Sequence, residues 1–71
     1  MLTRVNLVRV MTDDREQQLW LAAVTSEHAV DAVLEIVPEG WSAALLDVLL
    51  TLHEIESLKM KPGEVRRLRA H

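Results

Sequence analysis

The chain has 71 residues, of which 49% are apolar, a formal net charge of −3 and no cysteine. This length predicts one domain, residues 1–71, near the lower size limit at which a hydrophobic core outweighs chain entropy. The lack of cysteine excludes disulfides, thiolate nucleophiles and cysteine-ligated metal sites. The apolar content excludes a disordered chain. Because so small a body has little interior, we expect some apolar surface to lie against a second copy or another protein.

The N-terminal segment does not follow the pattern of a secretory signal. Arg4, Asn6 and Arg9 interrupt its apolar residues, and no small-residue cleavage site follows. No apolar run approaches the roughly 20 residues that cross a bilayer. We therefore expect a cytoplasmic protein without a membrane segment.

The first part of the chain predicts a β-hairpin. Residues 2–12, LTRVNLVRVMT, interleave β-branched and polar residues, as a half-buried strand does. Asp13 and Asp14 favour a tight turn. Residues 17–25, QQLWLAAVT, are apolar on both faces and suit a central strand. A helix over residues 16–37 is the alternative, because Leu, Ala and Gln favour helices and short apolar runs are ambiguous.

Residues 26–37 carry the clearest helix pattern in the sequence. Thr25 or Ser26 can cap its N-terminus, and Pro38 and Gly40 end it. Its apolar side chains recur at helical spacing at Ala29, Val30, Val33, Leu34 and Val37. We expect this helix to cover one face of the sheet.

Residues 41–60, WSAALLDVLLTLHEIESLKM, fit either one long helix or two elements. The segment TLHE has the form of a capping box, in which Thr51 and Glu54 bond each other's backbone N–H groups. This predicts a second helix from Leu52 to about Lys59 and a short strand over residues 43–50.

The C-terminal tail is the basic part of the chain. Residues 1–58 carry three basic and ten acidic side chains, a net charge of −7, whereas residues 59–71 carry five basic and one acidic, a net charge of +4. Pro62 and Gly63 predict a turn, followed by a strand over residues 64–69. In that strand Val65, Arg67 and Arg69 would lie on one side, with Arg66 on the other.

The C-terminal half also carries a resemblance. The segment PEGW, the helix entered at a threonine and the tail SLKMKPGEVRRL resemble small bacterial proteins of unassigned function. These proteins end in a similar Leu-x-Met/Leu-x-Pro-Gly-Glu-Val-Arg-x-Leu pattern. The resemblance implies a short helix, a terminal strand and a bacterial cytosolic setting, and it brings no active site.

Motifs for catalysis or cofactor binding are missing from the sequence. His28, His53 and His71 lie far apart without metal-ligand spacing, so we expect no metal site. The serines are better explained as helix caps or solvated helix residues than as nucleophiles. The two glycines form no phosphate-binding loop. We expect no enzyme, no cofactor and no small-molecule substrate.

Five residues remain as candidates for interaction. Trp20 and Trp41 are the only aromatic residues, and we interpret them as core or interface anchors. Arg66, Arg67 and Arg69 could contact phosphates, although alternation would divide them between two faces. A basic edge strand also protects a sheet against aggregation.

Together these patterns predict an α+β domain in the order β-β-α-β-α-β, an antiparallel sheet with helices packed on one face. The predicted function is a non-catalytic interaction module, with a homodimer or another protein as partner. The alternative is a nucleic-acid-binding accessory or regulatory protein that uses the basic terminal strand. A small enzyme or ligand binder, with a pocket formed only on folding, is a third hypothesis.

Overall fold

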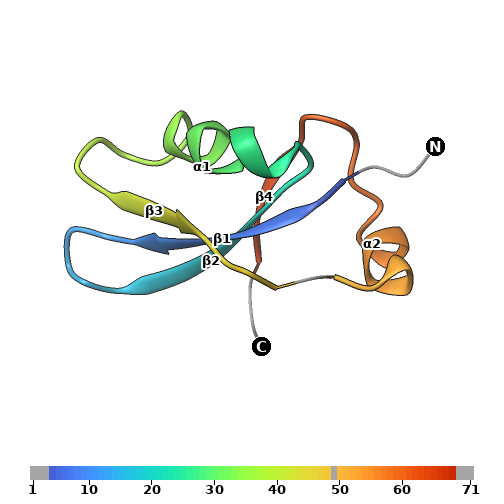
Figure 1. Ribbon diagram of the computed structural model, residues 1–71. Helices are drawn as coiled ribbons and strands as arrows, with labels where there is room; N and C mark the ends of the chain where they lie inside the picture. Colours follow the sequence, from blue (N-terminus) through green and yellow to red (C-terminus); the bar gives the residue numbers. More distant parts are fainter. Residues whose placement is uncertain (1–3, 49, 69–71) are drawn as a thin grey trace.

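The computed structural model describes residues 4–48 and 50–68 (Figure 1). Its elements are β1 (Asn6–Met11), β2 (Gln17–Ala22), α1 (Ser26–Leu34), β3 (Ser42–Leu45), α2 (Leu52–Leu58) and β4 (Val65–Leu68). All strand pairs are antiparallel, and the strands lie in the order β3-β1-β2-β4. The predicted α+β class and element order are confirmed. The alternatives of a helix over residues 16–37 and a long helix over residues 41–60 are wrong.

A tight turn joins β1 to β2 at the centre of the sheet. The N–H of Thr12 donates to the C=O of Glu16 at 2.9 Å, and the N–H of Arg15 donates to the C=O of Thr12 at 3.0 Å. Arg15 has a φ of 65°, the left-handed conformation that such a hairpin loop needs at this position. The buried Thr12 hydroxyl accepts a further bond from the N–H of Glu16 at 3.1 Å. The predicted hairpin therefore forms, with β2 as a central strand.

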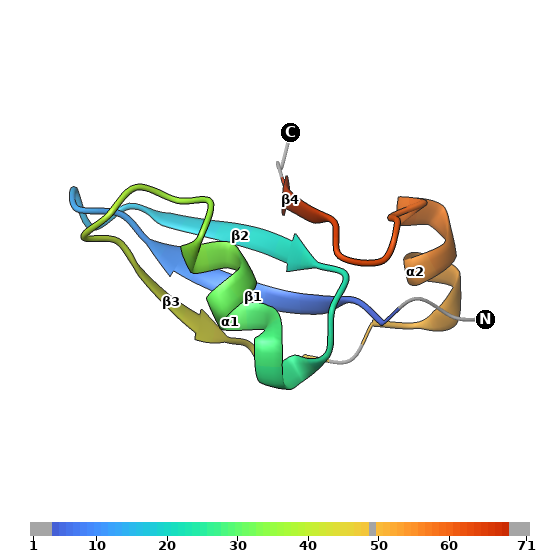
Figure 2. The same ribbon diagram turned by 90° about the horizontal axis from the view of Figure 1, so that it is seen from above.

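The larger hydrophobic core lies between α1 and one face of the sheet. On β1 every second residue, Val8 and Val10, belongs to this core, because successive side chains of a strand point to opposite faces. Figure 2 shows α1 in front of the strands, mainly over β3 and β1. The buried members are Val8, Val10, Ala22, Ala29, Val33 and Val37. The prediction that this helix covers one face is confirmed.

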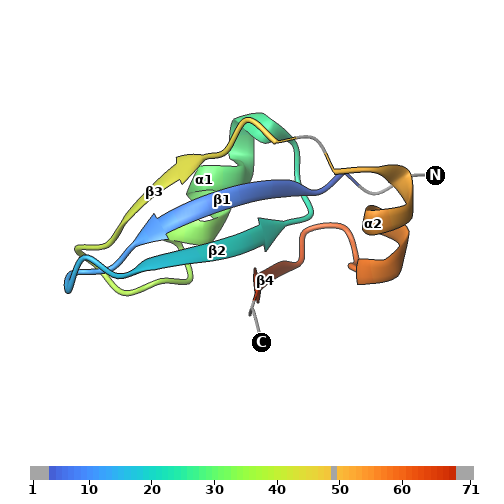
Figure 3. The same ribbon diagram turned by 90° about the horizontal axis from the view of Figure 1, so that it is seen from below.

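A smaller cluster lies on the other face, at the end of the sheet where α2 sits (Figure 3). Leu21, Ala23 and Met60 are buried in it, and Ile55 and Leu58 of α2 pack against them. Because Leu21 alternates with Ala22 along β2, it points away from α1. The expectation that the helices share one face is therefore wrong for α2.

Local signals at the helix ends agree with most of the predicted boundaries. The Thr51 hydroxyl accepts from the N–H of Glu54 at 3.1 Å, and the Glu54 carboxylate accepts from the N–H of Thr51 at 2.9 Å, which confirms the capping box. The first helix ends at Leu34, earlier than predicted, and the N–H groups of Ile36 and Val37 both donate to the C=O of Val33 in the turn that follows. Thr25 is its N-cap residue, without a side-chain capping bond.

The third strand is shorter than the predicted range of residues 43–50. It pairs with β1 from Ser42 to Leu45, and the N–H of Leu46 adds a last bond to the C=O of Leu7. The last paired residue, Leu45, faces Val8, so Leu7 and Asn6 of β1 extend beyond the paired part of β3.

Candidate interaction site

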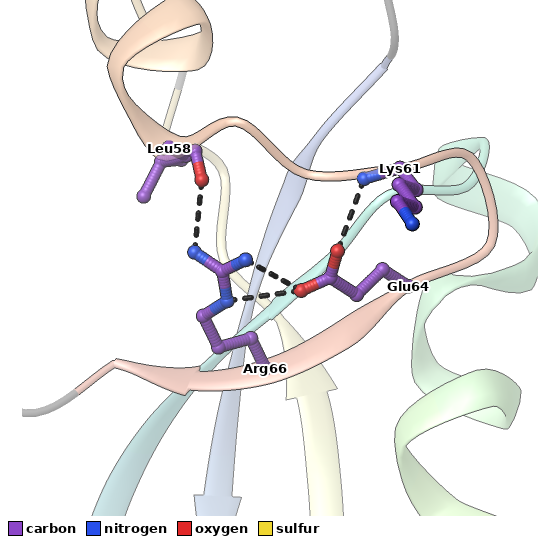
Figure 4. Close-up of polar contacts among 4 residues, drawn as sticks. All are labelled: Leu58, Lys61, Glu64 and Arg66. Atoms are coloured by element: carbon purple, nitrogen blue, oxygen red, sulfur yellow. Dashed lines mark hydrogen bonds and ion pairs between the residues drawn. The ribbon is translucent and has the colours of Figure 1, made fainter.

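The C-terminal strand β4 is an edge of the sheet, and its Arg66 is held by neighbouring groups (Figure 4). The Arg66 guanidinium donates to the Glu64 carboxylate from Nη2 at 2.6 Å and from Nε at 3.0 Å. Its Nη1 donates to the C=O of Leu58, the last residue of α2, at 2.9 Å. The other Glu64 oxygen accepts from the N–H of Lys61 at 3.0 Å. Arg66 therefore links the end of α2 to β4, and Glu64 balances its charge.

Three other predicted interaction residues, Trp20, Trp41 and Arg67, lie on the opposite side of the sheet. Arg67 is the cross-strand partner of Trp20, while Arg66 is the partner of Leu21. Trp20 and Trp41 are half-buried against the core under α1, and the Trp20 Nε1–H donates to Gln18 Oε1 at 3.1 Å. The arginines of β4 thus divide between two faces, as the alternation predicted.

Arg69, the remaining predicted candidate, lies outside the described residues. Within the described part of β4, no single face carries a cluster of arginines. This arrangement presents fewer charges to one phosphate backbone than the composition of the tail suggests.

An apolar groove of about 370 Å³ lies between α2 and the face of the sheet opposite α1. Most of its lining is leucine, with a polar edge from Glu54 and Ser57 on α2. The apolar lining residues are Leu7, Leu21, Val48, Leu50, Leu58 and Leu68. Because α2 covers only the end of this sheet face, apolar side chains such as Leu68 and Val48 stay exposed beside it.

The other edge of the sheet, β3, has a different character. Its residues Ser42–Leu45 read SAAL, so they carry no charge and no proline. Strand β3 pairs with β1, and no other described strand lies beside it. Ser42–Leu45 has no charged or aromatic side chain, so the sequence did not indicate this edge as a site. An uncharged strand of small residues was the signal that could have indicated it.

Two glutamates, the exposed Glu54 and the partly exposed Glu64, have pKa values lowered by hydrogen bonds. For Glu54, the N–H of Thr51 is the main cause, followed by the Thr51 side chain. For Glu64, the N–H of Lys61 lowers the pKa most, and the bond from Arg66 comes second. Both causes act because hydrogen bonds to a carboxylate favour its charged form.

These pKa shifts predict acid sensitivity at the α2 end of the molecule. A carboxyl whose folded pKa lies below its ordinary value of 4.5 stabilises the fold above that pH, and the contribution is lost as pH falls through the folded pKa. We expect the free energy of unfolding to fall between about pH 5 and pH 3. Urea unfolding in this pH range measures it.

The matched variants for that measurement are Glu64→Gln and Glu56→Gln. The first removes a carboxylate that accepts bonds from Lys61 and Arg66, so it should flatten the pH dependence. The second removes an exposed glutamate of α2 that serves as the control. Equal pH profiles for the Glu64→Gln variant and the wild-type protein would contradict the assignment.

Metal-binding groups, membrane-spanning helices and the histidines can also be assessed in the described part of the chain. No three histidine, aspartate or glutamate side chains in residues 4–48 and 50–68 are grouped so that they could hold a metal ion. Neither helix of this part of the chain has the length and apolarity needed to cross a membrane. The His28 ring Nδ1 lies 2.9 Å from the Thr25 hydroxyl, next to the start of α1. His53 is exposed on α2, and His71 lies outside the described residues.

Comparisons with protein-family models, with curated proteins and with solved structures found no match. The candidate sites of this chain are therefore the features described above, the apolar groove and the two edges of the sheet.

Proposed function

We propose that this chain is a non-catalytic interaction module that associates with a second copy of itself. This proposal rests on one observation: many large apolar side chains are exposed to water on so small a domain. The exposed large residues are Leu19, Leu34, Ile36, Leu45, Val48, Leu52 and Leu68. Single exposed apolar residues are common on soluble proteins, but a contiguous patch of them marks an interface.

Several of these residues occur beside features that could accept a partner. Leu68 and Val48 line the groove under α2, and Leu19 is the cross-strand partner of Leu68. Leu45 belongs to the uncharged edge strand β3. Burial of such residues at an interface would add to the small core of the isolated chain.

The nucleic-acid alternative has less support from the geometry. Arg66 is paired with Glu64 and with the C=O of Leu58, and Arg67 lies on the other face beside Trp20. Both tryptophans are half-buried against the core, whereas single-strand binders stack bases on exposed aromatic rings.

Sedimentation equilibrium over a range of concentrations tests the proposal. We expect the mean mass to rise from the 8.1 kDa of the monomer towards twice that value as concentration increases. A mass of 8.1 kDa at every concentration up to about 1 mM would contradict self-association. The alternative function predicts instead that the protein binds DNA or RNA oligonucleotides in low salt and loses affinity as salt is added.

A further inference from the structure

The backbone of β3 presents a defined set of hydrogen-bonding groups at the edge of the sheet. The N–H of Leu46 donates to the C=O of Leu7 at 2.9 Å, so Leu46 directs its backbone groups towards β1. Along an antiparallel strand this direction alternates from one residue to the next. Ala44 and Ser42 therefore also bond towards β1, and Ala43 and Leu45 direct their N–H and C=O groups outwards.

The two edges of the sheet differ in what protects them. On β4, Arg66 and Arg67 place charge on both sides of the edge, which is a usual means of preventing strand pairing. On β3, Ser42–Leu45 has no charged side chain and no proline to oppose an added strand. The unprotected edge is therefore β3.

Symmetry and charge then decide which strand can be added. Antiparallel pairing of β4 with its own copy, centred on Arg66 or Arg67, would place two arginines opposite each other, and like charges on facing strands repel. Pairing of β3 with β4 of another copy is head-to-tail, so it would build a larger ring or an open filament instead of a closed dimer. Pairing of β3 with its own copy closes after two chains, because the same surface serves both.

We propose that β3 pairs antiparallel with β3 of a second copy, so that the two sheets join into one. This inference rests on the self-association proposed above and names its surface. Facing residues of an antiparallel pair have their side chains on the same side of the sheet. Because side chains alternate along a strand, the two-fold axis between two identical strands must pass through a residue position and not between two residues. With the axis at Ala44, Ala43 exchanges both backbone bonds with Leu45 of the partner subunit, and Leu45 does the same with Ala43 of the partner subunit.

The side chains of β3 are suited to this register. Ala44 is exposed on the face away from α1, and at the axis it would face Ala44 of the partner subunit, where the two backbones come closest. Leu45 is 42% exposed and lies on the α1 face, as the partner of the buried Val8. Next to the small Ala43 of the partner subunit it would lose part of that exposure.

The joined sheet would also bring the two α1 helices to the same side. A two-fold axis perpendicular to a sheet keeps its faces, and α1 lies mainly over β3 and β1 (Figure 2). Stable interfaces bury about 800 Å² on each partner, more than four residues of edge strand provide. An interface limited to the two edge strands would therefore be a weak, concentration-dependent one.

Disulfide trapping tests the register, because the chain has no cysteine of its own. In the proposed dimer the Cα atoms of residue 44 face each other as a non-hydrogen-bonded pair, about 4.5 Å apart, which is within the range of a disulfide. We expect the Ala44→Cys variant to form a covalent dimer under mild oxidation about tenfold faster than Glu56→Cys, an exposed control on α2 outside the groove lining. Equal rates for the two variants would overturn the proposal.

A charge substitution provides an independent measurement. Ala44→Lys would place two ammonium groups opposite each other at the axis, and we expect the dimer dissociation constant to rise about tenfold or more. The circular dichroism spectrum of the diluted monomer should stay unchanged because residue 44 is exposed. Glu56→Lys, on α2 and outside the groove lining, should leave the dissociation constant unchanged.

The outcomes separate this proposal from the one on which it rests. If the wild-type protein dimerises but the Ala44 variants behave like the Glu56 variants, self-association holds and β3 pairing is wrong. If the wild-type protein stays a monomer at every concentration and Ala44→Cys gives no excess of covalent dimer, both proposals are wrong. Faster trapping at residue 44 together with a weaker Ala44→Lys dimer supports both.

Discussion

Replacement of Val33 with aspartate is expected to unfold the domain at neutral pH. Val33 is 0% exposed and packs in the core between α1 and the sheet, among Val8 and Val10. A carboxylate without a partner in such a site costs several kcal/mol. A chain of this length is stable by only roughly 4–10 kcal/mol, so the penalty is comparable to the whole stability. Circular dichroism and urea unfolding measure the loss.

The matched control is Leu34→Asp, one position further along the same helix. Leu34 is 40% exposed, so an aspartate there stays in water. We expect the free energy of unfolding to change by less than about 1 kcal/mol, measured at low concentration to keep the protein monomeric. Equal destabilisation by the two substitutions would mean that α1 does not present Val33 to the sheet as described.

The elements of this fold were predictable where the signal lies within a few residues. The β-branched residues mixed with polar ones around Val8 and Val10 indicated a half-buried strand, and the spacing of Ala29 and Val33 indicated a helix with one apolar side. The capping box at Thr51 identified the start of α2, although the surrounding leucines fit one long helix equally well. In each case the pattern or hydrogen bond that determines the element involves residues only a few positions apart in the sequence.

Features that depend on how distant segments meet were not predictable in this way. The periodicity of α2 shows that Ile55 and Leu58 share a side, but not which face of the sheet they reach. The same holds for Arg66, whose bond to the C=O of Leu58 joins residues on either side of a turn. The edge formed by β3 was not predictable for the same reason, because only the strand order β3-β1-β2-β4 places this strand at an edge of the sheet.

Truncation of Leu21 to alanine is expected to lower the free energy of unfolding by about 3 kcal/mol. Leu21 is 2% exposed and belongs to the smaller cluster. Ile55 and Leu58 of α2 pack against this cluster. No residue of α2 is itself fully buried, so the helix depends on its contact with Leu21. In the Leu21→Ala variant the backbone amides of α2 should therefore exchange with solvent before those of the other elements.

The matched control is Leu19→Ala, on the same strand and the same face but 38% exposed. It should lower the free energy of unfolding by about 1 kcal/mol or less. Urea unfolding with hydrogen exchange measures both effects, and equal losses for the two variants would show that Leu21 does not hold α2 against the sheet.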